Sequence, residues 1–199
     1  MEIAVFATEE QWTELRNNEP GSLKRATKVS DITENIDAVI ILREDLAFEF
    51  SAFSKPIFLN SVVTTLNEMK APANVLRVNG WPGFIGRKTW EVSGSLSQGA
   101  SVVLTTLGKT SKVVGDEPGF VSASVIAMII NEAFFSLEDE ISTRADIDTA
   151  MKLGTNYPLG PFEWCAKIGA HNIYNLLNKL SARDKRYLPS RLLAKEAVL

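Results

Sequence analysis

The first half of the chain alternates short apolar runs with longer polar stretches. The apolar runs are Glu2–Phe6, Ile36–Leu42, Pro56–Asn60 and, less strongly, Trp90–Val92. Runs of this kind are typical of strands that are covered on both faces, as in a parallel sheet. The polar stretches between them suit helices and loops, so the pattern predicts a small α/β layer fold.

The stretch after the first apolar run carries signals for a helix. Thr8 is a suitable cap for a helix from Glu9 to Leu15, and two acidic residues in its first turn favour the positive end of the helix dipole. Asn17–Gly21, which contains Pro20, is expected to end this helix.

From Asp116 onward the apolar positions recur at helical spacing. The recurring positions are Phe120, Val125, Ile129, Ile130, Ala133, Phe134 and Leu137. Further helices are expected after the capping pair Thr143 and Asp146, with Gly154 as a stop, and over residues 162–168, 172–180 and 190–197. We therefore predict two domains, an α/β domain over residues 1–112 and an all-helical domain over residues 113–199.

Composition excludes several classes of function. The chain has 199 residues and a formal net charge of −3, and its acidic and basic residues are interspersed. This favours neither nucleic acid nor a membrane surface as a partner. The longest apolar run, Ala123–Ile130, is too short to cross a bilayer, and the N-terminus does not read as a signal peptide. The lone Cys165 permits no intramolecular disulfide, so we expect a cytoplasmic protein.

Five motifs in register resemble the C-terminal domain of 3-hydroxyacyl-CoA dehydrogenases. They are Leu107–Lys109, Asp116–Phe120, Asn131–Ala133, Asp146–Gly154 and Tyr157–Glu163. The resemblance implies a helical domain of the kind also found at the C-terminus of 6-phosphogluconate dehydrogenase. A weaker resemblance to the family's N-terminal domain is found at Asp37–Ile40, Ser61–Leu66 and Lys88–Val92. In the family that domain is a larger dinucleotide-binding fold, so the first half of this chain is expected to be a shortened Rossmann-like domain.

The resemblance implies NAD as the cofactor, but the residues that would bind it are missing. The fingerprint needs glycines after the first strand, where the backbone approaches the pyrophosphate. Here Ala7–Trp12 contains no glycine and places Glu9 and Glu10 near that point. Lys24–Thr27 occupies the stretch where the acidic ribose ligand is expected. We therefore expect no cofactor.

The family's catalytic groups are also eroded. The resemblance matches Glu91 to the glutamate that orients the catalytic histidine. The histidine position falls on Asn79, to within one residue, and Asn79 cannot accept a proton at neutral pH. Thr64 matches the substrate-binding serine. Ala123 and Ser124 replace the family's asparagine and arginine. Glu91 is either a relic or an active group, and Thr64 is either a helix cap or a substrate contact.

Other residues allow two interpretations each. His171, the only histidine, is read as a surface or capping residue or as a relocated base. Cys165 is read as a core residue, because no basic neighbours suggest a lowered thiol pKa. Trp81–Phe84 and Trp90 either line a residual acyl pocket or only pack.

These residues lead to one main functional hypothesis. It is a dehydrogenase-like protein without dehydrogenase activity, which acts as an acyl-CoA-binding or dimeric assembly module in fatty-acid metabolism. An acyl carrier is the other expected ligand, and the helical domain is expected to form a homodimer. The alternatives are an active NAD-dependent enzyme with an atypical cofactor site and Glu91 or His171 as base, a hydrolase using Thr64 or Cys165, and one component of a split enzyme.

Overall fold

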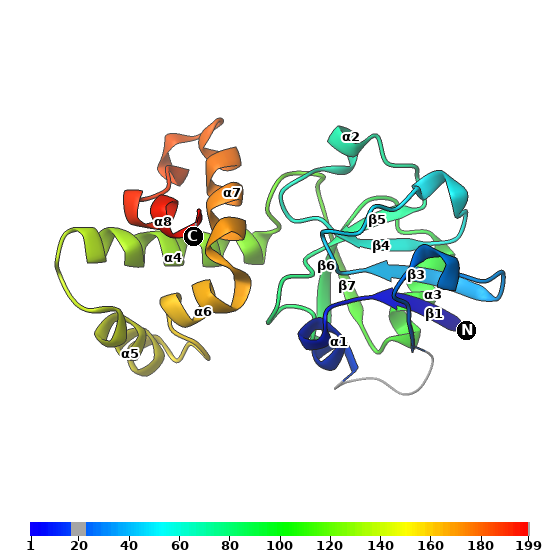
Figure 1. Ribbon diagram of the computed structural model, residues 1–199, viewed down its shortest axis with the longest axis horizontal. Coiled ribbons are helices and arrows are strands. Elements are labelled where there is room, and N and C mark those ends of the chain that lie inside the picture. Colours follow the sequence, from blue (N-terminus) through cyan, green and yellow to red (C-terminus); the bar gives the residue numbers. More distant parts are fainter. Residues whose placement is uncertain (17–22, 199) are drawn as a thin grey trace. The chain divides into compact units, whose positions relative to one another are not determined.

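The computed structural model describes residues 1–16 and 23–198. The chain forms two compact units, Met1–Glu117 and Pro118–Leu199 (Figure 1). The first unit is an α/β layer structure and the second is entirely helical. This confirms the fold class expected from the sequence. The boundary between the units lies a few residues beyond the proposed position 112, because a strand of the first unit runs through that position.

The first unit contains one seven-stranded sheet with the order β2-β1-β3-β4-β5-β6-β7. Its neighbouring strands pair in parallel, except for the antiparallel pair β5 and β6. The strands are β1 (Glu2–Phe6), β2 (Leu23–Arg25), β3 (Ile36–Ile41), β4 (Ile57–Asn60), β5 (Val75–Val78), β6 (Thr89–Ser93) and β7 (Thr110–Val114). The helices of this unit are α1 (Glu9–Arg16), α2 (Leu66–Met69) and α3 (Gln98–Thr106), with 3-10 turns at Val29–Asp31 and Phe50–Ala52.

Both faces of the sheet are buried, which explains why its central strands are apolar throughout. In β1, Ile3 and Val5 belong to one core cluster, whereas Ala4 and Phe6 belong to the cluster on the opposite face. This alternation follows from the two-residue repeat of a strand. The first cluster also takes in Leu15 of α1 and the buried residues of α3.

The apolar runs located β1, β3, β4 and β6 to within about two residues of their ends, but three strands were missed. Each missed strand carries polar residues that break an apolar run. β2 is a short edge strand, Leu-Lys-Arg, and β7 is a mostly exposed edge strand, Thr-Ser-Lys-Val-Val. β5 is central, but its sequence Val-Leu-Arg-Val contains a buried arginine. The stop expected at Asn17–Gly21 lies outside the described residues.

The helical unit is built around α4 (Val121–Glu138). The other helices are α5 (Arg144–Thr155), α6 (Pro161–Ile168), α7 (Ala170–Ser181) and α8 (Arg191–Glu196), with a 3-10 turn at Lys185–Tyr187. α4 contacts each of the other four helices. Its residues Ile126, Ile130 and Phe134 are buried. α4 is also long and apolar enough to span a membrane by length and composition, a test that the core helix of a soluble unit passes as well.

One expected helix end was wrong. Gly154 does not stop α5, which continues to Thr155 and ends at Asn156 in the left-handed conformation, with a φ of 55°. A short polar residue such as asparagine tolerates this conformation, so it can replace glycine as the end signal.

The start of α6 is held by a carboxylate from α5. Asp148 accepts hydrogen bonds from the backbone N–H groups of Phe162, at 2.8 Å, and Glu163, at 3.2 Å. Gly160 lies against this carboxylate so closely that a Cβ atom there would stand 2.3 Å from Asp148 Cγ. Two of the family-like motifs therefore meet in one packing contact.

We predict that Gly160→Ala destabilises the protein by about 1–3 kcal/mol, because the added methyl group must displace the carboxylate that caps α6. Gly154→Ala is the matched control, since a Cβ at that position meets nothing within 4 Å. That change should be neutral or stabilise by about 0.4–1 kcal/mol. Denaturant unfolding followed by circular dichroism measures both, and equal stabilities of the two variants would contradict the packing argument.

Candidate functional site

The positions that the sequence analysis matched to the family's catalytic pair lie directly after β5 and within β6. The antiparallel register pairs Arg77 with Ser93 and Val78 with Val92. Continued by one residue, it places Asn79 opposite Glu91. Asn79 is buried, and its Oδ1 accepts a hydrogen bond from the backbone N–H of Trp81 at 3.2 Å. The two sequence-predicted positions thus lie next to the last registered pair of β5 and β6, Val78 and Val92.

Glu91 has a cationic neighbour. Arg87 interacts electrostatically with both Glu91 and Glu14, and its guanidinium lies 4.1 Å from the centre of the Phe84 ring. The carboxylate of Glu91 is therefore partly balanced by an arginine from the loop between β5 and β6.

Thr64 lies in the bend that follows β4. It is exposed, and its carbonyl oxygen accepts a hydrogen bond from Ser61 Oγ at 2.7 Å. The interpretation of Thr64 as a helix cap is wrong by one residue. Thr65 caps α2, because its hydroxyl accepts from the Glu68 N–H while the Glu68 carboxylate accepts from the Thr65 N–H.

A buried glutamine occupies the crevice at the start of α1. Thr8 and Gln11 form a reciprocal cap, in which each side chain accepts a hydrogen bond from the other's backbone N–H. Gln11 Nε2 then donates to the carbonyl of Leu42 at 3.0 Å and to that of Gly80 at 3.4 Å. One side chain thus links the ends of β1, β3 and β5. The sequence predicted the cap at Thr8 but not this second role of Gln11.

Asn60 completes the link between the strand ends. Its Nδ2 donates to the Leu42 carbonyl at 3.0 Å, and its Oδ1 accepts from the Gly80 N–H at 3.0 Å. A Cβ atom at Gly80 would lie 2.6 Å from Asn60 Cβ, so this position requires glycine. The carboxyl ends of the four strands are therefore joined by two buried amide side chains.

This arrangement does not fit a dinucleotide. In doubly wound sheets the ligand lies outside the carboxyl ends of the strands, where the strand order reverses. Here that point is between β1 and β3, and Gln11 spans it to reach Leu42. Glu9 and Glu10 occupy the first turn of α1, where the pyrophosphate would need positive potential.

The glycine-containing loop after β5 is already filled by a carboxylate. Glu14 of α1 accepts hydrogen bonds from the backbone N–H groups of Gly83, at 2.8 Å, and Gly86, at 2.9 Å. These N–H groups are therefore engaged within the protein. The loop anchors α1 to the sheet, and Trp81 in the same loop is almost completely buried.

A fully buried arginine organises the neighbouring loop. Arg77 of β5 donates from Nε to the Ser61 carbonyl at 2.8 Å and from Nη2 to the Val62 carbonyl at 3.1 Å. Its Nη1 lies 2.6 Å from Asp116 Oδ1. Asp116 also accepts from the N–H groups of Leu66 and Asn67 at the start of α2. The signal in the sequence was an arginine inside the apolar run of β5.

The pKa of Asp116 reflects these contacts. Partial burial raises it, but hydrogen bonds from the Asn67 and Leu66 N–H groups and from Arg77 outweigh burial, so the pKa lies below the ordinary value of 3.8. The carboxylate is therefore charged at neutral pH, as the buried guanidinium requires.

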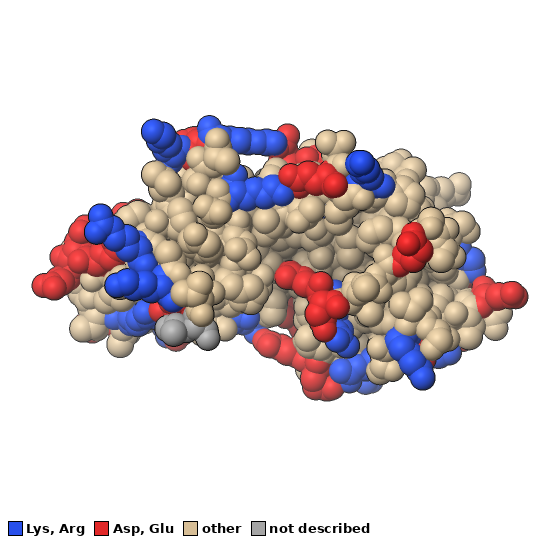
Figure 2. Space-filling model, turned by 45° about the horizontal axis from the view of Figure 1, so that its top comes forward, with Lys and Arg blue, Asp and Glu red and all other residues tan. Residues whose placement is uncertain are grey.

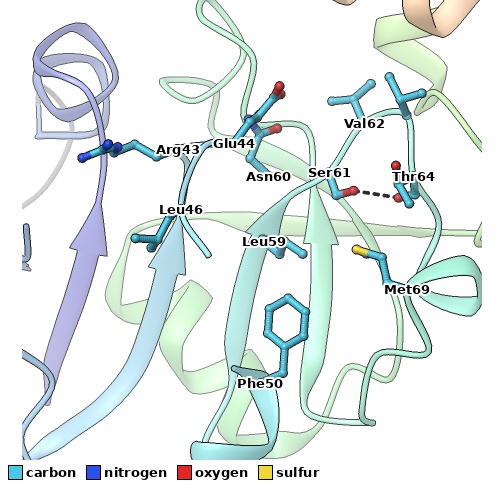
Figure 3. Close-up of a pocket in the computed structure, with 11 residues that line it drawn as sticks. Arg43, Glu44, Leu46, Phe50, Leu59, Asn60, Ser61, Val62, Thr64 and Met69 are labelled. Carbon is cyan, nitrogen blue, oxygen red and sulfur yellow. Dashed lines mark hydrogen bonds between the residues drawn. The ribbon is translucent and has the colours of Figure 1, made fainter. Parts of the chain in front are cut away.

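A cavity of about 360 Å³ lies beside this network, at the carboxyl ends of β3 and β4 (Figure 3). Its lining combines polar groups with an apolar wall. The polar side is formed by Arg43, Glu44, Asn60, Ser61 and Thr64, and the apolar side by Leu46, Phe50, Leu59, Val62, Val63 and Met69. The cavity lies wholly within the first unit.

The remaining candidate residues lie in the helical unit. Ala123 is fully buried, and Ser124 Oγ donates to the Gly119 carbonyl at 2.6 Å. His171 is exposed in the first turn of α7. Cys165 is buried, which confirms its interpretation as a core residue, and burial together with Glu196 raises the pKa of its thiol to about 12.

The surface offers no other site of concentrated charge on the visible face. Charged side chains of both signs are interspersed there (Figure 2). Within residues 1–16 and 23–198, no group of three or more His, Cys, Asp or Glu side chains is placed to hold a metal ion.

The architecture defines a class of protein. A mostly parallel sheet that reverses its strand order at β1 is the plan of the doubly wound α/β domains, and here a separate helical unit follows it. Comparison with known proteins narrows this class. Residues 119–197 match the family model of the 3-hydroxyacyl-CoA dehydrogenase C-terminal domain. The helical unit is therefore similar to the C-terminal domain of the 3-hydroxyacyl-CoA dehydrogenase family, as the sequence motifs indicated.

Individual relatives agree with this assignment. The chain is 41% identical over 107 residues to the 3-hydroxyadipyl-CoA dehydrogenase of Escherichia coli (strain K12), a match that covers 53% of this chain and 22% of the relative. A crystal structure of 3-hydroxybutyryl-CoA dehydrogenase from E. coli matches 71% of this chain and 31% of that chain, with a TM-score of 0.61 and 31% identity. The matched part therefore spans only about a fifth to a third of these relatives.

A third relative is similar in fold along nearly the whole chain. The structure of (S)-3-hydroxybutyryl-CoA dehydrogenase from Ralstonia eutropha matches 98% of this chain and 92% of that chain, with a TM-score of 0.72 and 17% identity. At this identity the likeness concerns the fold alone. It includes the first unit, in which the family-like motifs were faint.

We predict that Asp116→Asn lowers the free energy of unfolding at pH 7 by about 1–3 kcal/mol, because a charge-assisted hydrogen bond to Arg77 is weakened. The folded pKa of Asp116 is lower than the unfolded one, so the unfolded chain takes up the proton first as the pH falls. The difference in the free energy of unfolding between wild type and variant should thus have its full size above about pH 5. It should disappear as the pH falls below 3.8, the ordinary pKa of an aspartate.

Melting temperatures between pH 7 and pH 2 test this prediction. Asp139→Asn is the control, since it removes an exposed carboxylate whose side chain has no hydrogen bond among the described residues. A difference between wild type and Asp116→Asn that does not change with pH would show that the carboxylate charge contributes nothing.

We also predict that Cys165 is inert in the folded protein, because its thiol is buried and its pKa is raised to about 12. An aromatic disulfide reagent at pH 8 should react at the rate of unfolding in buffer and immediately in denaturant. Cys165 is the only cysteine of the chain, so the absorbance reports on it alone. Rapid reaction in buffer would show that the Cys165 thiol is accessible, which would support a nucleophilic role for this residue.

Proposed function

We propose that the protein is a 3-hydroxyacyl-CoA dehydrogenase-like protein without dehydrogenase activity. It binds an acyl-CoA or an acyl carrier, or it serves as a dimeric assembly module, in fatty-acid metabolism in the cytoplasm. The observation that supports this most directly is the side chain of Gln11, which spans the crevice between β1 and β3. A hydride acceptor of the family's kind has no place there while this side chain is in position.

The catalytic positions support the same conclusion. Asn79, which directly follows the last registered residue of β5, occupies the position matched to the family's base, and a carboxamide does not act as a general base at neutral pH. Loss of such a base alone lowers a rate by about 10²–10⁴-fold. The proton acceptor and the hydride acceptor would both have to be supplied from elsewhere.

Retained binding is the positive part of the proposal. The relatives are named for acyl-CoA substrates, and the first unit keeps a cavity with both polar and apolar walls. Such a lining suits a small ligand with an apolar chain and an oxygen-bearing head.

A homodimer is supported by the surface of the helical unit. Most of the exposed large hydrophobic side chains in the described part of the chain belong to that unit, including Val121, Val125, Ile141, Leu153 and Leu188. Where such side chains adjoin one another they form the kind of apolar surface that protein–protein contacts bury. Light scattering after size exclusion chromatography measures the oligomeric state directly.

The similarity to dehydrogenases supports one alternative function. In this alternative, the protein is an enzyme with an atypical NAD site that uses Glu91 or His171 as base. Titrations separate the two proposals. A ligand that binds only the folded state raises the melting temperature. At 100 times its dissociation constant, such a ligand stabilises the folded state by about 2.7 kcal/mol.

We predict that CoA or acetoacetyl-CoA raises the melting temperature by several degrees, while NADH at the same concentration leaves it unchanged. Asn79→His, which restores an imidazole opposite Glu91, should produce no NADH-dependent turnover of acetoacetyl-CoA. NADH binding at micromolar concentration would overturn the proposal and favour the enzyme. If neither ligand binds, the acyl-CoA part of the proposal is wrong and only the assembly role stands.

A further inference from the structure

The loop between β5 and β6 directs two backbone N–H groups at one carboxylate. The Gly83 N–H donates to Glu14 Oε2 at 2.8 Å, and the Gly86 N–H donates to Glu14 Oε1 at 2.9 Å. Each oxygen of the planar carboxylate therefore has its own donor. Backbone N–H groups that converge in this way form anion-binding concavities in many proteins. The loop thus has the geometry of a carboxylate site whose occupant is a side chain of the protein itself.

The Ile85–Gly86 peptide is fixed from the side opposite Glu14. The Ile85 carbonyl accepts hydrogen bonds from Trp90 Nε1 at 2.9 Å and from Lys109 Nζ at 3.2 Å, and both donors belong to buried residues. In a trans peptide the N–H points away from the C=O, and the described residues contain no cis peptide. The two buried donors therefore hold the Gly86 N–H in its direction whether or not a carboxylate is present. The positive charge on Lys109 also polarises this peptide, which makes its N–H a stronger donor.

Arg87 adds a positive charge beside the two N–H groups. Its guanidinium interacts electrostatically with Glu14 and Glu91 and lies 4.1 Å from the centre of the buried Phe84 ring. A neutral ligand in place of the Glu14 carboxylate would leave the N–H groups without a charged acceptor. A second carboxylate would keep the same hydrogen bonds and the same local charge. The surroundings therefore select a ligand that carries a carboxylate.

The side chain of Glu14 can leave the loop while α1 stays in place. The helix is held by Leu15, which is fully buried in the core, and by Gln11, which donates to the carbonyl groups of Leu42 and Gly80. Glu14 itself is only half-buried. Rotation about its side-chain bonds moves the carboxylate between staggered positions without a change in the helix backbone. Exchange of one carboxylate for another at the loop therefore requires no unfolding.

We propose that the N–H groups of Gly83 and Gly86, together with Arg87, form a binding site for a ligand carboxylate. Glu14 closes this site as an internal competitor, and its side chain moves out when the ligand binds. None of these residues lines the cavity at the carboxyl ends of β3 and β4. The inference is therefore independent of the proposed acyl-CoA binding.

Glu14→Ala opens the site, and acetate is the probe. We expect acetate to raise the melting temperature of this variant in a saturable manner, relative to sodium chloride at the same ionic strength. The wild type should need at least about tenfold more acetate for the same rise, because its own carboxylate competes at a high effective concentration. A variant that does not respond to acetate would overturn the site. Equal responses of variant and wild type would overturn the role of Glu14.

Glu14→Gln keeps the volume of the side chain and tests the proposal should the alanine variant not fold. Its carboxamide has one acceptor oxygen in place of two, so acetate should displace it more easily than it displaces the carboxylate. The amide signals of Gly83 and Gly86 in a nuclear magnetic resonance titration report where acetate binds. If these two signals do not move while the melting temperature rises, acetate acts elsewhere and the proposal is wrong.

Glu10→Ala is the matched control, because Glu10 is an exposed glutamate of the same helix. Acetate should stabilise this control no more than it stabilises the wild type. Arg87→Gln, combined with Glu14→Ala, should weaken the binding of acetate by at least about threefold, since an exposed cation is lost. Unchanged affinity in the double variant would remove Arg87 from the site. Inorganic phosphate is the second probe, and tighter binding of phosphate than of acetate would overturn the carboxylate class.

Discussion

A fully buried guanidinium constrains much of the first unit. A charge without water must be neutralised and hydrogen-bonded, otherwise burying it costs several kcal/mol. Arg77 meets this requirement with the carboxylate of Asp116 and with carbonyl groups from the loop after β4 and from Glu117. The hydrogen bonds of Arg77 and Asp116 therefore connect the cavity wall, the start of α2 and the last residues of the unit in a single network. This network holds both the polar wall of the cavity and the backbone of the loop beside it.

The family-like motifs of this chain contain residues that stabilise the helical unit. Asp148 caps α6 and requires glycine at position 160. Asn131 joins α4 to the segment before α8, because its amide binds both the Leu188 carbonyl and the Ser190 N–H. These contacts keep the helical unit folded whatever chemistry the other unit performs. Kinship read from such motifs is thus strong evidence for the fold and weak evidence for the reaction, which depends on different residues.

The sequence predicted those features that local patterns encode. Continuous apolar runs located four strands, and the recurrence of apolar residues located the helices of the second unit. The match of Asn79 and Glu91 to the family's catalytic positions followed only from counting against the family, and it stays a prediction. The roles of Gln11 and Arg77 could not be predicted, since each joins segments far apart in the chain. A polar residue in an apolar run signals that a partner exists but does not say which one.

The two structural roles of Gln11 limit which substitutions the protein tolerates at this position. The same side chain caps α1 and ties together strand ends that come from distant parts of the chain. A mutation to glycine, the first step toward an open crevice, would remove both supports at once and leave buried carbonyl groups with fewer donors. Opening a cofactor crevice at this point would therefore begin with a loss of stability that no new ligand yet compensates. The side chain that closes this part of the sheet edge is thus one that the fold cannot lose without a cost in stability.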